Sequence, residues 1–187
     1  EIGVRDWSSD VCSSDLNIEI ELDERALIVS KTDQKGQITY INRDFIDISG
    51  FTEAELIGQP HNIVRHPDMP SEAFTDMWSD LKDGRPWTGM VKNRCKNGDH
   101  YWVLATATPI RENGQIAGYM SVRRKPTRQQ VEAAESAYRL FREKKAGGLQ
   151  IRHGEVVKGG EGFLAGWSLK KRPVAGFGVL LAAMVLV

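Results

Sequence analysis

The sequence predicts an α+β domain in which antiparallel strands and helices occupy separate stretches of the chain. Strand-like runs occur in two groups, and apolar side chains in the segment between them have the spacing that is typical of helices. Asn97-Gly98 and Asn113-Gly114 separate the runs of the second group, and Asn-Gly is typical of hairpin turns. The last three strands are therefore expected to form an antiparallel meander.

The strands are predicted from short runs of apolar and β-branched residues bounded by turn residues. A turn that ends at Gly36 joins the first two strands as a hairpin, and Pro126 ends the last strand. The five predicted strands span residues 26–32, 37–42, 87–95, 101–111 and 115–124.

The helices are predicted from apolar spacing and from capping residues. Thr52 and Glu55 have the spacing of a capping box, which predicts a helix start at this point. Gly50, Gly58 and Gly147 are placed to end three of the helices. The predicted helices lie around Phe45 and Ile48 and over residues 52–57, 71–82 and 127–145, the last of them amphipathic.

The segment from Gly58 to Pro70 contains three prolines, two histidines, an arginine and an aspartate. Proline fixes φ and removes a backbone donor, so this run cannot form a regular helix. We expect a stiff, irregular loop that presents Arg, His and Asp side chains. Such a loop predicts a binding wall rather than a simple connector.

Composition excludes several classes of protein. The 187 residues carry 25 basic and 25 acidic side chains, so no net charge favours nucleic acid as a partner. Two cysteines, Cys12 and Cys95, provide neither a disulfide framework nor a zinc-binding spacing, and a reducing, cytoplasmic setting is the simpler interpretation. No metal site, nucleophile triad or glycine-rich phosphate loop is predicted.

The two ends differ from the middle. Residues 1–16 have neither helical nor strand periodicity, and residues 5–16 resemble a translated sequencing adapter, so they are interpreted as an artefact or a disordered leader. The domain is predicted over 17–125, followed by a helix at 126–146 and a linker at 147–172. Residues 173–187 are uncharged and follow Lys170-Lys171-Arg172, which predicts a truncated transmembrane segment; a buried C-terminal helix is the alternative.

The order of the predicted elements resembles the PAS fold over residues 27–125. The resemblance implies a five-stranded antiparallel sheet with helices packed on one face, to which the C-terminal helix and the partial membrane span are added. PAS domains differ in what they bind, so the fold alone predicts no ligand.

Longer motifs narrow the resemblance. The chain resembles the sensor domain of bacterial aerotaxis receptors at Gly58–Asn62, Arg65–Pro70, Met77-Trp78, Pro86-Trp87, Val91–Arg94 and Lys96–Val103. That family implies FAD in a cytoplasmic PAS domain, at the cytoplasmic face of the inner membrane. It also implies a membrane anchor, a HAMP segment, a chemoreceptor signalling domain and a homodimer. This chain is then an N-terminal fragment and a redox or oxygen sensor, not an enzyme.

A flavin ring needs apolar walls and a polar edge. Trp78 and Trp87 are candidate walls, together with Phe74 on the same predicted helix as Trp78; the alternative is that both tryptophans belong to the core. Amide side chains both donate and accept, so Asn42 and Asn93 are candidates for the ring's polar edge. The alternative for Asn93 is a surface position on its strand.

The phosphates of FAD need fixed donors. Arg65 can donate two hydrogen bonds to a phosphate, and His61 or His66 can add another. Asp68 would repel phosphate, so we expect it to hold Arg65 or to cap the helix that begins near Ser71. The resemblance implies that Arg65, His66 and Asp68 are needed for FAD binding, and a network that only shapes the loop is the alternative.

Other ligands and other functions predict different residues in this chain. A light-sensing flavin domain would place a reactive cysteine in the helical loop, which has none. Haem would need an axial ligand such as His61, His66 or His100, but the tryptophans and the Arg-His-x-Asp run favour flavin. The domain is also compatible with the sensory part of a membrane-bound histidine kinase or diguanylate cyclase, or with an empty PAS domain used for dimerisation.

Overall fold

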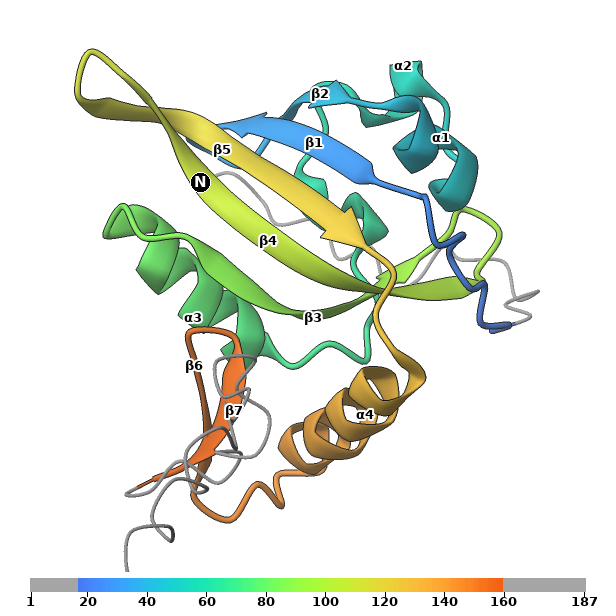
Figure 1. Cartoon of the computed structure of the whole chain (residues 1–187), viewed down its shortest axis with the longest axis vertical. Helices are drawn as coiled ribbons and strands as arrows, with labels where there is room; N and C mark the ends of the chain where they lie inside the picture. Colours follow the sequence, from blue (N-terminus) through green and yellow to red (C-terminus); the bar gives the residue numbers. More distant parts are fainter. Residues whose placement is uncertain (1–16, 160–187) are drawn as a thin grey trace, which may run out of the picture.

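The computed structural model describes residues 17–159 and contains the predicted five-stranded antiparallel sheet (Figure 1). Its strand order is β2-β1-β5-β4-β3, so β3 and β2 are the edges and the first and last strands of the domain meet in the middle. The strands are β1 Ile28–Asp33, β2 Ile38–Ile41, β3 Trp87–Arg94, β4 His100–Glu112 and β5 Gln115–Arg124.

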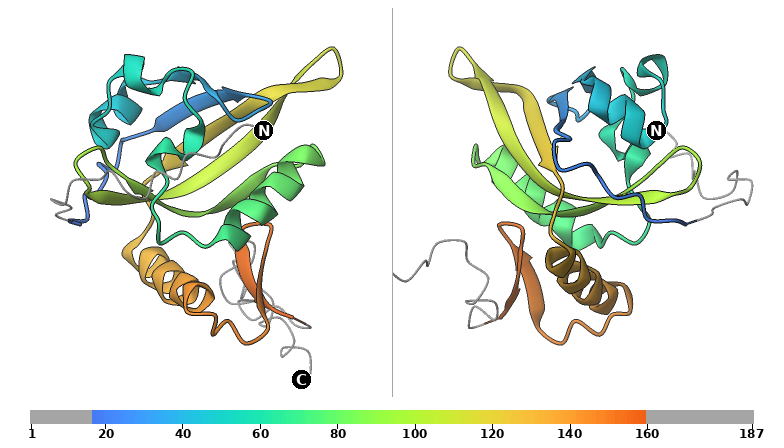
Figure 2. Two further views of the ribbon diagram at one scale, coloured as in Figure 1. Left: turned by 180° about the vertical axis from the view of Figure 1, so that it is seen from behind. Right: turned by 45° about the vertical axis from the view of Figure 1, so that its right-hand side comes forward.

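Of the helices between β2 and β3, the first two lie near β1 and β2 and the longest lies beside β3, whereas the helix after β5 lies elsewhere (Figure 2). The helices between β2 and β3 are α1 Arg43–Ser49, α2 Glu53–Leu56, the 3₁₀ helix η1 His61–Val64 and α3 Ser71–Lys82. The last helix, α4 Arg128–Arg142, stacks Tyr138 on Trp102 and donates the Tyr138 hydroxyl to the carbonyl of Met90 at 2.9 Å. Trp102 of β4 pairs with Lys92 of β3. Lys92 lies between Val91 and Asn93, whose side chains line the cavity described below. Because side chains alternate along a strand, α4 covers the opposite face of the sheet.

Local signals predicted most element boundaries. Helix α3 and strand β5 have the predicted limits, and the Thr52–Glu55 capping box is present with both of its hydrogen bonds. The remaining strands differ by one or two residues at their ends, which is the usual uncertainty of fraying termini. The loop between Gly58 and Pro70 is irregular as expected, apart from the single 3₁₀ turn of η1.

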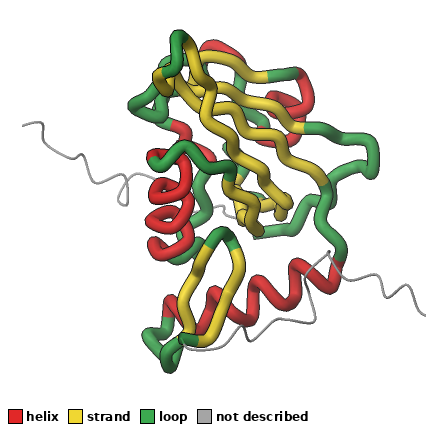
Figure 3. Tube along the Cα trace, turned by 60° about the vertical axis from the view of Figure 1, so that its left-hand side comes forward, coloured by secondary structure: helices red, strands yellow, loops and turns green. Residues whose placement is uncertain are grey.

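The stretch predicted as a connector after α4 contains a two-stranded hairpin. Its strands are β6 Leu149–Arg152 and β7 Glu155–Lys158, joined by a turn in which His153 and Gly154 both have positive φ. Figure 3 shows this hairpin beside α3. The hairpin was not predicted from the weak apolar pattern of this stretch, because four-residue strands are too short to show a clear period.

No helix within residues 17–159 is long and apolar enough to span a membrane. The predicted leader at 1–16 and the predicted membrane segment at 173–187 lie outside the described residues.

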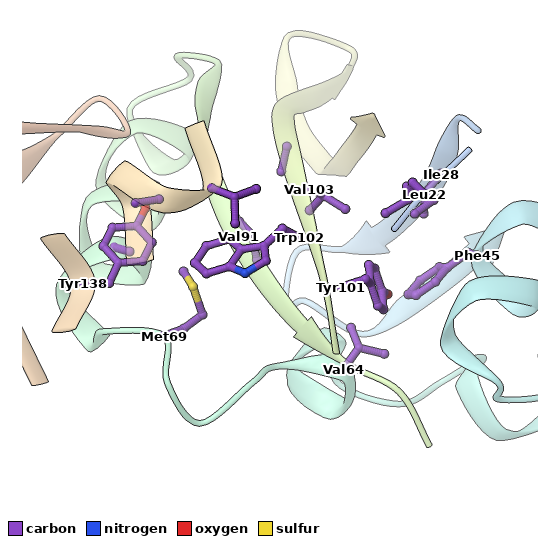
Figure 4. Close-up of a cluster of buried hydrophobic side chains, with 14 of the residues drawn as sticks. Leu22, Ile28, Phe45, Val64, Met69, Val91, Tyr101, Trp102, Val103 and Tyr138 are labelled. Carbon is purple, nitrogen blue, oxygen red and sulfur yellow. The ribbon is translucent and has the colours of Figure 1, made fainter. Parts of the chain in front are cut away.

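The main hydrophobic core is one cluster of side chains that extends over both faces of the sheet (Figure 4), and a smaller cluster contains Leu81, Ala107 and Tyr119. Phe45 and Tyr101 are fully buried on the side of α1. Trp102, Met69 and Tyr138 pack on the side of α4. The sheet is therefore covered on both faces, and the cavity described next lies between its inner face and α3.

Candidate cofactor pocket

A cavity of about 290 Å³ lies between the inner face of the sheet and the segment that runs from η1 to α3. Strands β1, β3, β4 and β5 form its floor, and α3 forms its roof. Its volume is at the lower end of the range that is common for small-molecule sites. The apolar walls are Phe74, Met77, Trp78, Leu81, Trp87, Val91, Ala105, Ala107 and Tyr119.

A buried arginine is the main polar feature of this cavity. Arg123, on β5, is only 5% exposed. Its Nη2 donates to Ser30 Oγ at 3.1 Å and lies 2.7 Å from His61 Nε2. Its Nη1 is buried and has no hydrogen-bond partner among the described residues. A donor of this kind, facing an apolar-walled cavity, is suited to an acceptor atom of a ligand.

His61 is neutral in this arrangement. Burial, and next the charge of Arg123, lower the pKa of His61 to about 3. A guanidinium can only donate, so Nε2 of His61 must be the acceptor and the ring proton is on Nδ1. Burial also lowers the pKa of Arg123, to about 10, which leaves it charged at neutral pH. The cluster therefore carries one buried positive charge.

The aromatic walls are held by contacts of their own. Trp87 donates its indole N–H to Asp76 Oδ2 at 2.7 Å, and Trp78 packs edge-on against Tyr119 at 5.2 Å between ring centroids. Asn93 is 4% exposed and lines the cavity from β3, on the same face as Trp87. Four of the predicted ring contacts, Phe74, Trp78, Trp87 and Asn93, therefore share one cavity with Arg123.

Arg65 lies at the cavity beside Phe74. Its guanidinium lies 4.0 Å from the centre of the Phe74 ring, and its only hydrogen bond to the described residues is a long one of 3.5 Å to the carbonyl of Met69. Lys35 and Asn62 are exposed and line the same region, so positive charge and amide donors surround the mouth. This part of the pocket can bind an anion.

His66 and Asp68 are turned away from the cavity and do not line it. Asp68 pairs with Lys92 Nζ at 2.9 Å on the outer face of the sheet, and its carbonyl accepts from Arg142 of α4 at 2.9 Å. His66 Nδ1 accepts the backbone N–H of Asp68, and its pKa is lowered to about 4 by burial and then by Lys92. The expectation that Asp68 holds Arg65 or caps α3 was wrong, because Pro70 precedes α3 without any side-chain cap.

Asn42 is also placed away from the cavity. Its side-chain oxygen accepts from the backbone of Phe45 and Val29, and its amide donates to the carbonyl of Leu27 at 2.6 Å. These bonds cap α1 and tie it to β1. Its amide is therefore occupied by the backbone.

Sequence reasoning missed Arg123, Ser30 and Tyr119 as pocket residues. The signal for Arg123 was present, because it lies two and four residues after Ser121 and Tyr119 on one face of β5. A charged residue on the inward face of a central strand is rare unless it has a partner or a function.

Residues 38–123 match the family described as PAS fold. The chain is 50% identical over 133 residues to the aerotaxis receptor of Escherichia coli K12, covering 71% of this chain and 26% of that receptor. It is 28% identical over 104 residues to the nitrogen fixation regulatory protein of Klebsiella pneumoniae, covering 55% of this chain and 21% of that protein.

A solved PAS domain from Colwellia psychrerythraea is 26% identical, with a TM-score of 0.50, and covers 54% of this chain and 86% of that one. The chain spans only about a quarter of the length of the two curated relatives.

Proposed function

We propose that this chain, which contains a PAS domain, binds FAD in the cavity beneath α3 and serves as the redox or oxygen sensor of a chemotaxis receptor. The observation that carries the proposal is the buried, incompletely paired guanidinium of Arg123 in a cavity with aromatic walls. The similarity to an aerotaxis receptor supports the sensory role.

The residues present fit a flavin. Its ring system is flat and largely apolar, with oxygen and nitrogen atoms along one edge, and the cavity combines Trp78, Trp87 and Phe74 with the polar groups of Asn93 and Arg123. A cavity of about 290 Å³ suits a ring system rather than a whole dinucleotide. The phosphates would therefore lie towards the mouth.

Each polar residue has a distinct task in this proposal. Arg123 donates Nη1 to an acceptor on the ring edge, while Ser30 and His61 hold its other nitrogen. Asn93 can donate and accept, so it can bond to the ring before and after a change in protonation. Arg65 binds phosphate, and its loose hydrogen bond to Met69 leaves the guanidinium free to do so.

His66 and Asp68 would not contact FAD. In this proposal they act indirectly, by holding the loop that carries Arg65. The ion pair between Asp68 and Lys92 fixes the loop that carries Arg65. Removing Asp68 would release this loop and strand a buried lysine, which is only 4% exposed. FAD binding should then be lost indirectly.

The domain's output would be a conformational change rather than catalysis. A bound flavin supplies reversible one- and two-electron redox chemistry. We place the domain at the cytoplasmic face of the inner membrane in a homodimer, joined through a membrane span to a HAMP segment and a signalling domain. The sensory part of a histidine kinase or diguanylate cyclase is the second candidate, because the chain spans only part of its relatives.

An absorption spectrum of the purified chain tests the proposal. Flavin bands near their usual wavelengths, with FAD as the released cofactor, are the expected result, and a Soret band or a colourless protein would refute it. Ala105→Phe should abolish the flavin bands, because Ala105 lines the cavity and is only 4% exposed. Ala133→Phe, on the half-buried side of α4, is the matched control and should retain them.

A further inference from the structure

The carboxylate of Asp76 joins the pocket wall to an element outside the pocket. Asp76 lies on α3, and its Oδ2 accepts the indole N–H of Trp87 at 2.7 Å. The same oxygen accepts the backbone N–H of Gly154 at 2.8 Å, and Oδ1 accepts that of His153 at 2.9 Å. A single side chain therefore holds a tryptophan of the cavity and the turn of the β6–β7 hairpin.

A second carboxylate, one helical turn further along α3, strengthens the same contact. Asp80 is 2% exposed and lies 2.8 Å from His153 Nδ1, while Arg85 donates to it from the other side. Burial alone would raise the pKa of Asp80, but the bonds from His153 and then Arg85 outweigh it and hold the pKa below its ordinary value. The hairpin turn thus binds α3 through both its backbone and its side chain.

The hairpin turn also packs against β3 without room for a side chain. A Cβ on Gly154 would lie 1.8 Å from the carbonyl oxygen of Thr88 and 3.0 Å from the Cα of Gly89. A Cβ on Gly89 would in turn lie 2.5 Å from the ring of Trp87. The same Cβ on Gly89 would lie 3.2 Å from the Cα of Gly154, so the turn and the Trp87 ring both pack against β3 at Gly89.

We propose that the β6–β7 hairpin is a latch that responds to the pocket through Trp87 and Asp76. When a ligand or a change in its redox state shifts the Trp87 ring, the indole N–H no longer donates to Asp76. The hydrogen bonds from the amides of His153 and Gly154 to the Asp76 carboxylate then weaken. The hairpin follows α4, so its release loosens the segment through which the chain leaves the domain. This inference rests on the proposed function only for the nature of the ligand that moves Trp87.

Hydrogen exchange of the purified chain tests the latch. Trp87→Phe retains an aromatic ring but lacks the N–H that reaches Asp76 and part of the indole, so the amides of His153 and Gly154 should exchange at least tenfold faster. Trp78→Phe is the matched control, because Trp78 lines the same cavity but bonds to neither carboxylate; the hairpin amides should exchange as in the parent chain. Equal exchange in the parent and in Trp87→Phe, or equal acceleration in both variants, would overturn the latch.

Two further variants keep the test independent of flavin binding. Asp76→Asn has the same shape but a weaker acceptor, and Gly154→Ala blocks docking by sterics, so each should accelerate exchange over residues 149–158 while the amides of β4 and β5 stay protected. Protected hairpin amides in both variants would refute the docked geometry. The flavin spectrum of the parent chain is recorded separately, so a colourless parent refutes the proposed function without touching the latch.

Discussion

The pH dependence of stability provides a direct test of the buried histidines. His61 has a pKa of about 3 in the folded chain, because it is buried and faces the charge of Arg123. Its unfolded value is about 6.5. Between pH 3 and pH 6.5 His61 is protonated in the unfolded chain but not in the folded chain. The free energy of unfolding must therefore fall as the pH falls below about 6.5. At pH 5 the cost for His61 is about 1.5 pH units at 1.36 kcal/mol each, or about 2 kcal/mol.

His66 adds to this effect, since its folded pKa is about 4, mainly because of burial. His100 shifts in the same direction, again mainly because of burial. The carboxylates change stability at lower pH than the histidines. Glu55, for example, has its pKa lowered from 4.5 to about 2, chiefly because Lys96 bonds to it. Between pH 6 and about pH 4.5, the pH dependence of the free energy of unfolding therefore comes mainly from the histidines.

Urea unfolding followed by far-ultraviolet circular dichroism, at fixed total flavin and several pH values, measures this slope. His61→Gln retains an acceptor for Arg123 but cannot titrate, so the slope should fall by about 1.4 kcal/mol per pH unit. His66→Gln should lower it by a similar amount. A His61→Gln chain with the parent's slope would show that His61 is protonated in the folded domain, and the neutral assignment would be wrong.

Three other substitutions test separate parts of the fold and the pocket. Thr127→Ala removes a capping-box bond of α4 and should cost about 1 kcal/mol in urea unfolding, whereas Thr127→Asn should cost little; equal losses would exclude a capping effect. Gly118→Ala puts a Cβ 2.3 Å from the carbonyl oxygen of Thr32 and should cost about 1–3 kcal/mol, and an unchanged midpoint would contradict the close approach of β1 and β5. Arg123→Met should weaken flavin affinity about 10- to 100-fold in a fluorescence titration, as expected for loss of a charged hydrogen bond, and parent-like affinity would remove Arg123 from the site.

Local features of this chain were predictable from its sequence. The capping box at Thr52, the limits of α3 and the hairpin turns depend on residues within a few positions of one another. The cavity walls were partly predictable for the same reason, because Phe74 and Trp78 are four residues apart on one helix and share a face. The cofactor was inferred from motif resemblance rather than from this geometry.

Long-range pairings were not predictable. Asp68 meets Lys92 from 24 positions away and Arg142 from 74 positions away, and nothing in the loop itself indicates that its carboxylate points to the outer face of the sheet. For this reason the sequence could not show that only Arg65 of the Arg-His-x-Asp run lines the cavity. Adjacent residues on an irregular loop can point to opposite sides of a sheet, so Arg65 faces the cavity and His66 does not.

The buried charge of Arg123 has a thermodynamic consequence. No ion pair joins this guanidinium to a carboxylate among residues 17–159, so its positive field in the cavity is not neutralised locally. A redox-active ligand that gains negative charge on accepting an electron would be bound more tightly in its reduced form than in its oxidised form. By the closed cycle of binding and reduction, the domain would raise the ligand's reduction potential, and the placement of one arginine would set the potential at which a bound ligand is reduced.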